Sequence, residues 1–105
     1  MSFPISAALL DAIVLAIVAR EGTYGYKITQ DIRTVMDISE STLYPVLRRL
    51  LKAGALETYD EAVDGRMRRY YKITPQGRMQ LIQYLSDWAA YRDRIESIFF
   101  GGRSK

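Results

Sequence analysis

The sequence predicts a mainly α-helical fold that contains one small β-hairpin and ends in a long helix. Three observations lead to this prediction. Apolar residues recur with the helical period of 3.6 as far as Gly54, and the pattern then changes to the alternation of a pair of strands. A final amphipathic stretch begins at Pro75. With 105 residues, of which 49% are hydrophobic, the chain is long enough for one small domain with a modest core.

The first predicted helix covers about residues 6–20. Its apolar run, residues 7–19, is interrupted only by Asp11. The run is shorter than the roughly 20 residues that span a bilayer, and no basic residue precedes it as in a signal peptide. We therefore expect no membrane segment here but a helix that is buried nearly all round, with a partner subunit covering part of it.

The second and third helices are predicted at about residues 24–35 and 39–54, joined by a three-residue turn. Thr23 and Ser39 are of the residue types that cap helix N-termini, and Gly54 is a typical stop. In the second helix Ile28, Ile32 and Val35 follow the i, i+4, i+7 spacing and form one apolar face.

Two strands are predicted at residues 55–60 and 67–73, and Asp64-Gly65 between them is a strong hairpin signal. Thr74 and Pro75 then open the last helix as N-cap and first residue, and this helix runs to about Phe100. The order of elements is that of a winged helix-turn-helix. We expect residues 1–74 to form it and residues 75–105 to supply a C-terminal dimerisation helix with a short basic tail, all in one compact domain.

The third helix divides into a core face and an outer face when it is projected at 100° per residue. After Glu40 the outer face has no acid, and its N-terminal end carries short hydroxyl side chains that suit base or phosphate contacts. A merely solvated helix face is the alternative. We predict a DNA-reading helix whose contact residues are Ser41, Thr42, Tyr44, Pro45, Arg48, Arg49 and Lys52.

Pro45 is unusual because it lies well inside this helix, where it cannot donate to the carbonyl of Ser41. The projection places the missing bond on the outer face, where water satisfies the carbonyl and the cost falls. The proline ring is then an apolar group at the centre of the reading face, suited to a thymine methyl.

The second strand of the hairpin is basic, and Arg66 and Arg68 are the predicted phosphate contacts. The alternative is that they pair with nearby acids. Those acids gather on the outgoing strand and at the hairpin tip, and they are Glu57, Asp60, Glu61 and Asp64.

The overall composition favours a polyanionic partner and disfavours an enzyme. The formal charge is +3, and the chain has neither Cys nor His. A Cys/His zinc site and a Ser-His or Cys-His nucleophile pair are therefore excluded, and we expect no cofactor. The lack of Cys also fits a cytoplasmic protein. A winged-helix adaptor that binds proteins and does not read DNA is the competing class, favoured by the acidic hairpin tip.

Taken together, the motifs resemble the PadR family of bacterial transcriptional regulators. The matching segments are Tyr24-Gly25-Tyr26-Lys27-Ile28, then Ser41-Thr42-Leu43-Tyr44-Pro45 with Arg49-Leu50 and Gly54, then Gly65-Arg66 with Arg69-Tyr70-Tyr71 and Ile73-Thr74, and Gly77. The single C-terminal helix resembles the smaller subfamily. The resemblance implies a homodimer that binds double-stranded DNA at a near-palindromic operator, usually as a repressor. Met67 and the acidic tip depart from the family pattern at the wing.

The last helix carries an apolar stripe too broad for one small core, which indicates a dimer seam. The apolar first helix is expected to pack against it, and the predicted interface residues are Leu10, Val14, Leu81, Leu85, Trp88, Ile95 and Phe99. By resemblance to multidrug-binding relatives, Trp88 with Tyr84 and Tyr91 would bind a flat aromatic effector. The alternative is that Trp88 only fills the interface.

Overall fold

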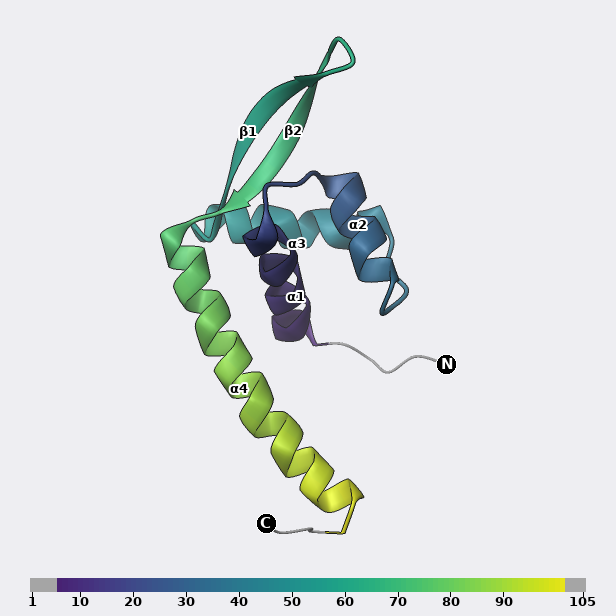
Figure 1. Cartoon of the computed structure of the whole chain (residues 1–105), viewed down its shortest axis with the longest axis vertical. Helices are drawn as coiled ribbons and strands as arrows, with labels where there is room; N and C mark the ends of the chain where they lie inside the picture. The colour runs from purple at the N-terminus through teal and green to yellow at the C-terminus, as the bar shows by residue number, and fades with distance from the viewer. Residues whose placement is uncertain (1–5, 102–105) are drawn as a thin grey trace.

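The structure, a computed structural model, describes residues 6–101 and measures 57 × 32 × 20 Å. Three helices form a compact body, the hairpin rises from one end of it, and the last helix extends beyond it in the opposite direction (Figure 1). The elements follow the predicted order: α1 (Ala7–Arg20), α2 (Gly25–Arg33), α3 (Glu40–Lys52), β1 (Leu56–Val63), β2 (Arg66–Ile73) and α4 (Pro75–Phe99). The mainly helical winged fold with a long C-terminal helix is therefore confirmed. The end of the predicted basic tail, residues 102–105, lies outside the described residues.

Hydroxyl side chains cap three of the helices. The Oγ of Ser39 accepts from the backbone N–H of Thr42, and Thr74 Oγ1 accepts from the N–H of Gly77 with Pro75 in the first turn. Ser6 caps α1 in the same way. The prediction for Thr23 was wrong. Its backbone is extended and exchanges two hydrogen bonds with Tyr71 of β2, which ties the start of α2 to the hairpin.

The hairpin has a continuous antiparallel register from Leu56 opposite Ile73 to Val63 opposite Arg66. Asp64 and Gly65 close it with φ of 51° and 78°, the left-handed conformation that two-residue hairpin turns need. Tyr71 and Ile73, with Leu56, bury the base of the hairpin in the core, while the outer part is exposed. The wing is therefore anchored at its base and free at its tip.

The core lies where α1, α2, α3 and the hairpin base meet. Val14 is completely buried, Leu10 is 9% exposed, and Leu81 at the start of α4 is also 9% exposed. The sequence placed all three in the dimer interface, and that assignment is corrected: the chain's own elements bury them. The apolar helix α1 is thus covered mostly by its own subunit.

The first turn of α4 is fixed to the end of α3. The hydroxyl of Thr74 donates to the carbonyl of Gly54 at 2.6 Å, and the N–H of Thr74 donates to the carbonyl of Ala55 at 3.1 Å. Gly77 lies directly against Ala55, with no room for a Cβ. α4 then runs beside α1, and its C-terminal part extends beyond the body (Figure 1). No helix in the described part of the chain is long and apolar enough to cross a membrane.

Candidate nucleic-acid interface

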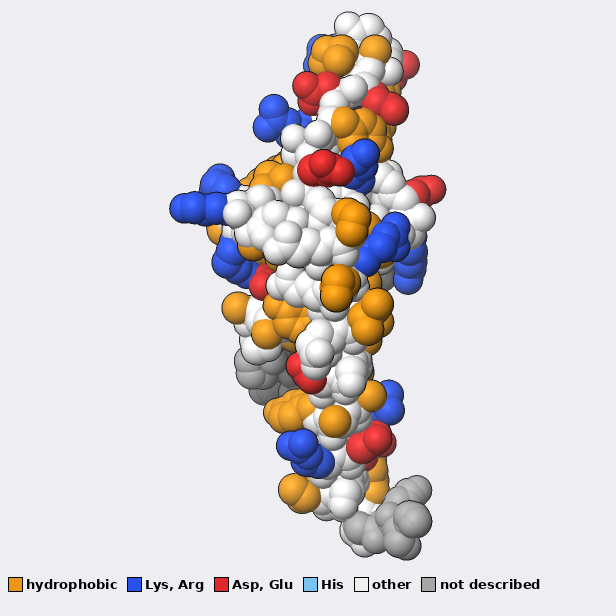
Figure 2. All heavy atoms as spheres, turned by 90° about the vertical axis from the view of Figure 1, so that its left-hand side faces the viewer, with side chains coloured by type: hydrophobic (Ala, Val, Ile, Leu, Met, Phe, Trp, Pro, Cys, Tyr) orange, Lys and Arg blue, Asp and Glu red, His pale blue; other side chains and the backbone are white. Residues whose placement is uncertain are grey.

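The outer face of α3 is exposed along its whole length, as the sequence predicted. Leu43, Val46, Leu47 and Leu50 face the core. All seven residues of α3 that were predicted to contact DNA lie on the exposed side: Ser41, Thr42, Tyr44, Pro45, Arg48, Arg49 and Lys52. Lys and Arg side chains are clustered at the height of α3 and the hairpin base (Figure 2).

Three hydroxyls gather at the N-terminus of α3. Ser39 Oγ lies 2.9 Å from Ser41 Oγ and 3.2 Å from Thr42 Oγ1. Arg33, at the end of α2, stands beside them, because its Nε donates to the carbonyl of Ile38 at 2.8 Å. Sequence reasoning missed Arg33. Arg33 lies in the last turn of α2, just before the loop that leads to α3, and this position could have indicated it from the sequence.

Tyr44 is less free than the other residues of this face. It is 39% exposed, and its ring lies over the start of α2, where a Cβ on Gly25 would stand 2.7 Å from its hydroxyl. Glycine at this position lets the tyrosine ring lie close to the α2 backbone. Tyr44 thereby links α2 to α3, as well as facing outward.

Arg49 differs from its neighbour Arg48. Its Nη2 donates to Oδ1 of Asp11, a buried residue of α1. Arg48 makes no ion pair within residues 6–101. The sequence assigned both arginines to the DNA; the structure turns Arg49 toward α1, because the long side chain reaches back across the helix to a carboxylate that the projection did not include.

On the wing, the basic residues fall into two groups. Arg69 pairs with Asp60 at 3.8 Å and Lys72 pairs with Glu57 at 3.6 Å. Arg66 and Arg68, the two predicted phosphate contacts, form no ion pair within the described residues. Their positive charges remain available to an external anion.

Arg68 is held in place by aromatic rings. Its guanidinium lies 4.2 Å from the centroid of the Tyr24 ring, a cation–π distance. Tyr24 in turn meets Tyr70 edge-on at 5.4 Å, and Tyr70 stacks on Tyr59 at 5.4 Å. This tyrosine ladder joins the start of α2 to the wing, and sequence alone did not reveal it because its members are distant in the chain.

A groove of about 840 Å³ lies between the start of α2, Tyr44 of α3 and the wing. Arg66, Arg68 and Arg69 line its wing side, and Tyr71 is also in its wall. Burial raises the pKa of the Tyr71 phenol and nearby Tyr44 adds to the rise, while Arg69 and Arg48 act against it. The phenol therefore stays neutral at physiological pH, and the positive charge of the groove comes from arginine.

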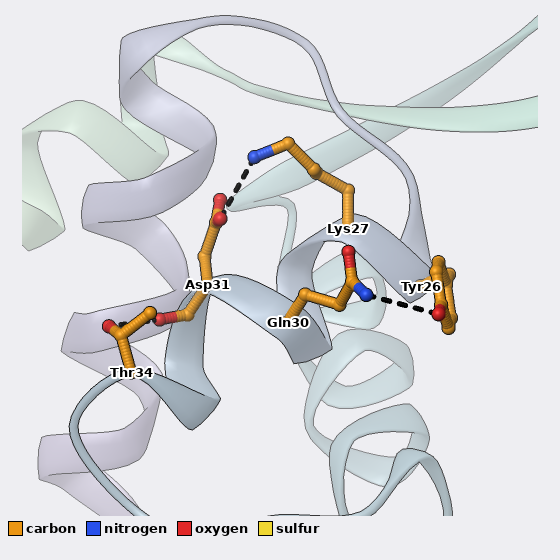
Figure 3. Close-up of polar contacts among 5 residues, drawn as sticks. All are labelled: Tyr26, Lys27, Gln30, Asp31 and Thr34. Atoms are coloured by element: carbon orange, nitrogen blue, oxygen red, sulfur yellow. Dashed lines mark hydrogen bonds and ion pairs between the residues drawn. The ribbon is translucent and has the colours of Figure 1, made fainter.

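The polar side chains on the outer face of α2 are paired with one another. Lys27 Nζ donates to Asp31 at 2.9 Å, and Gln30 Nε2 donates to the hydroxyl of Tyr26 at 3.0 Å (Figure 3). Asp31 raises the pKa of Lys27, so this lysine is charged but already paired. Thr34 adds a hydrogen bond to the carbonyl of Asp31 (Figure 3). These polar groups satisfy one another within the helix.

A second, apolar groove of about 780 Å³ runs between α1 and α4. Tyr84, Trp88 and Tyr91, the predicted effector residues, line its α4 side, and Ala12 and Ala16 are on its α1 side. Trp88 is 43% exposed, and its ring centroid lies 6.5 Å from that of Tyr91. Hydrophobic side chains lie exposed along the lower part of the molecule in the view from the α4 side (Figure 2). In the predicted seam, Leu85 and Phe99 are exposed and Ile95 is half-buried.

The arrangement of helix, turn, helix and wing has a direct counterpart among known proteins. Residues 14–83 match the model of the transcriptional regulator PadR-like family. The chain belongs to the PadR-like family of transcriptional regulators.

This PadR-like chain is similar to a protein of known structure and to a named transcriptional regulator. The crystal structure of smu.1704 from Streptococcus mutans superposes with a TM-score of 0.91 at 41% identity, over 100% of this chain and 99% of that one. The transcriptional regulator Rv3488 of Mycobacterium tuberculosis is 43% identical over 61 residues, 57% of each chain.

Bacillus subtilis PadR, solved in complex with operator DNA, shares the fold with a TM-score of 0.67 at 21% identity, over 72% of this chain and 46% of that one. The PadR-like protein therefore has the architecture of a family that regulates transcription, and membership in that family favours a regulator over an enzyme.

Proposed function

We propose that this PadR-like protein is a homodimeric, sequence-specific DNA-binding repressor that works in the cytoplasm. The observation that carries the proposal is the outer face of α3, which presents hydroxyls and arginine without any competing acid after Glu40. Arg66 and Arg68 lie across the groove on the wing, without an ion-pair partner in the described part of the chain. The DNA complex of Bacillus subtilis PadR, which has the same fold, supports it.

In the proposed complex, α3 enters the major groove and the wing follows the backbone. The N-terminal hydroxyls of Ser41 and Thr42 reach base edges or phosphates, and Pro45 supplies an apolar contact. Arg48, Lys52 and the two wing arginines neutralise phosphates, so the affinity should fall steeply with salt. Two α3 helices, one from each subunit, read half-sites about one helical turn apart.

Replacing Arg48 with alanine tests this directly. We expect operator affinity to fall by about tenfold and the slope of log K against log salt to fall by about 1, because one phosphate contact is lost. The operator used is a duplex that the wild-type protein selects from a randomised DNA pool, and binding is followed by fluorescence anisotropy. Lys27→Ala is the matched control: Lys27 is already paired with Asp31, so its loss should leave both quantities unchanged.

The competing function is a winged-helix adaptor that binds a protein. The exposed acids of the wing, Glu61 and Asp64, favour it, since acids repel the DNA backbone. If Arg48→Ala and the wild type bind every duplex equally weakly, the adaptor is the better assignment.

Pro45→Ala should separate the two roles of the proline. The fold should gain between zero and about 3 kcal/mol in the free energy of unfolding, the upper limit being the full cost of a proline inside a helix. Preference for the selected operator over a scrambled duplex should fall by about fivefold, since one methyl-sized apolar contact contributes about 1 kcal/mol. Unchanged preference would show that the ring only shapes the helix. Ser86→Ala, in exposed α4 surface, is the control.

The dimer is proposed from the apolar surface of α4. Leu85, Trp88, Ile98 and Phe99 are all exposed in the single chain, and Leu85 and Trp88 also line the groove against α1. Exposed apolar side chains gathered on one helix favour a protein–protein contact. A second copy of α4 is the occupant we infer.

The same groove is the proposed place for a flat aromatic effector, as the resemblance to multidrug-binding relatives implies. The rings of Tyr84, Trp88 and Tyr91 would supply stacking surface on α4. Saturable quenching of Trp88 fluorescence by planar aromatic compounds, with release of operator, supports an effector site. Its absence across a panel supports interface packing alone.

A further inference from the structure

Asp11 is the single charged residue in the apolar run of α1, and it is 8% exposed. A buried carboxylate needs a hydrogen-bonding or charged partner, because it has lost its water. Arg49 of α3 supplies that partner through Nη2. Within residues 6–101 this is the only ion pair between two helices, since the other four lie inside one helix or inside the hairpin.

The pair joins a helix of the core to the helix that reads DNA in the proposed function. Leu15 of α1 and Leu50 of α3 belong to the same buried hydrophobic cluster. The hydrophobic effect itself is not directional, so it specifies the position of α3 against α1 less sharply than a hydrogen bond does. A hydrogen-bonded ion pair is directional, and it specifies one position of α3 against α1.

Breaking the pair with Asp11 would cost free energy if Arg49 moved to the DNA. Arg48 has no such pair to break. If Arg49 turned to a phosphate, the Asp11 side chain, only 12% exposed, would remain charged without a partner. Arg48 has no ion-pair partner in the described residues and reaches a phosphate without such a loss. The two adjacent arginines should therefore act differently.

We propose that Arg49 is a positioning residue: its pair with Asp11 fixes α3 for operator recognition, and Arg49 itself does not touch DNA. This proposal rests on the proposed DNA-binding function. It assigns specificity to a residue of α1, Asp11, that lies away from the outer face of α3. When the pair is broken, the position of α3 against α1 is less strictly fixed. The helix then still binds phosphates but discriminates poorly between DNA sequences.

Four variants test the assignment: Arg49→Gln, Asp11→Asn, the double variant D11N/R49Q, and Arg48→Gln as the matched control. For each, affinity for the selected operator and for a scrambled duplex is measured over a range of salt concentrations. Thermal unfolding is recorded in parallel. The double variant removes both partners of the ion pair, so its comparison with the two single variants shows whether they act through the same contact.

We expect Arg49→Gln and Asp11→Asn each to reduce the operator preference by about tenfold with little change in the salt slope of the scrambled duplex. D11N/R49Q should lose about as much operator preference as either single variant and no more, because all three variants break the same pair. Arg48→Gln should instead lower the salt slope by about 1 on both duplexes. Asp11→Asn keeps Arg49 and removes the buried charge, so it remains informative if Arg49→Gln does not fold.

The proposal is overturned if Arg49→Gln lowers the salt slope as Arg48→Gln does, or if the losses of preference of the two single variants multiply in D11N/R49Q. It is also overturned if Asp11→Asn keeps the full operator preference. These outcomes are separate from failure of the proposed function, which would appear as a wild-type protein that selects no sequence from the pool.

Discussion

Replacing Leu85 with aspartate should convert the protein into a monomer and reduce operator affinity by about 100-fold or more. Leu85 is 51% exposed in the single chain and lies in the wall of the apolar groove between α1 and α4. A carboxylate there would be desolvated without a partner when a second α4 covers the groove. A monomer brings only one α3 helix to the DNA, so the gain from linking two half-site contacts is lost. Sedimentation velocity and fluorescence anisotropy measure the two effects.

Ser86→Asp is the control for this variant. Ser86 is the next residue of α4, is exposed, and is not in the wall of the groove. It should leave both the dimer and the affinity unchanged, which would show that the effect of Leu85→Asp depends on the face of the helix. A Leu85→Asp variant that sediments as a dimer and binds normally would contradict the proposed seam.

Gly77→Ala should destabilise the fold by about 3 kcal/mol, a large part of the stability of a small domain. A Cβ at this position would overlap the backbone carbonyl oxygen of Ala55 and would stand 2.8 Å from Cγ1 of Ile73. The oxygen cannot move aside easily, because it accepts a hydrogen bond from Thr74 N at 3.1 Å. The first turn of α4 must therefore shift away from the hairpin base. Urea unfolding at one fixed protein concentration measures the loss.

Ser86→Ala in the exposed middle of α4 is the comparison, with an expected change within about 0.5 kcal/mol. If Gly77→Ala is equally neutral, the close contact between α4 and Ala55 does not contribute as described.

Local sequence signals predicted most of the secondary structure of this small protein. Ser39 and Thr74 cap helices because their hydroxyls reach a backbone N–H within the same turn. Asp64-Gly65 makes the hairpin turn because both residues adopt positive φ. These are interactions between residues close in the chain, and residue type with spacing is enough to identify them.

Patterns of apolar residues did not reveal which subunit covers a buried face. Leu10 and Val14, from the apolar run of α1, and Leu81, from the stripe of α4, were placed in a dimer seam, but the chain's own core buries all three. The spacing of apolar residues predicts that a side chain is buried, whereas tertiary packing decides which element or subunit covers it. Leu85 and Trp88, on the same helix as Leu81, do remain exposed in the single chain.

In the candidate site, too, the sequence did not predict contacts between residues that are distant in the chain. The exposed face of α3 follows from helical projection, but the partner of Arg49 is 38 residues away, on α1. Thr23 has the residue type of a helix cap, yet it forms a β-bridge with Tyr71 because the hairpin base lies beside it. Each of these results depends on elements that meet only in the folded chain.

Selection from a randomised pool of duplex DNA by the wild-type protein tests the central claim most directly. We predict enrichment of one near-palindromic sequence with half-sites centred about one helical turn apart, followed by nuclease protection of both half-sites. A pool that remains random after repeated rounds at moderate salt would contradict the account of α3 as a sequence-reading helix.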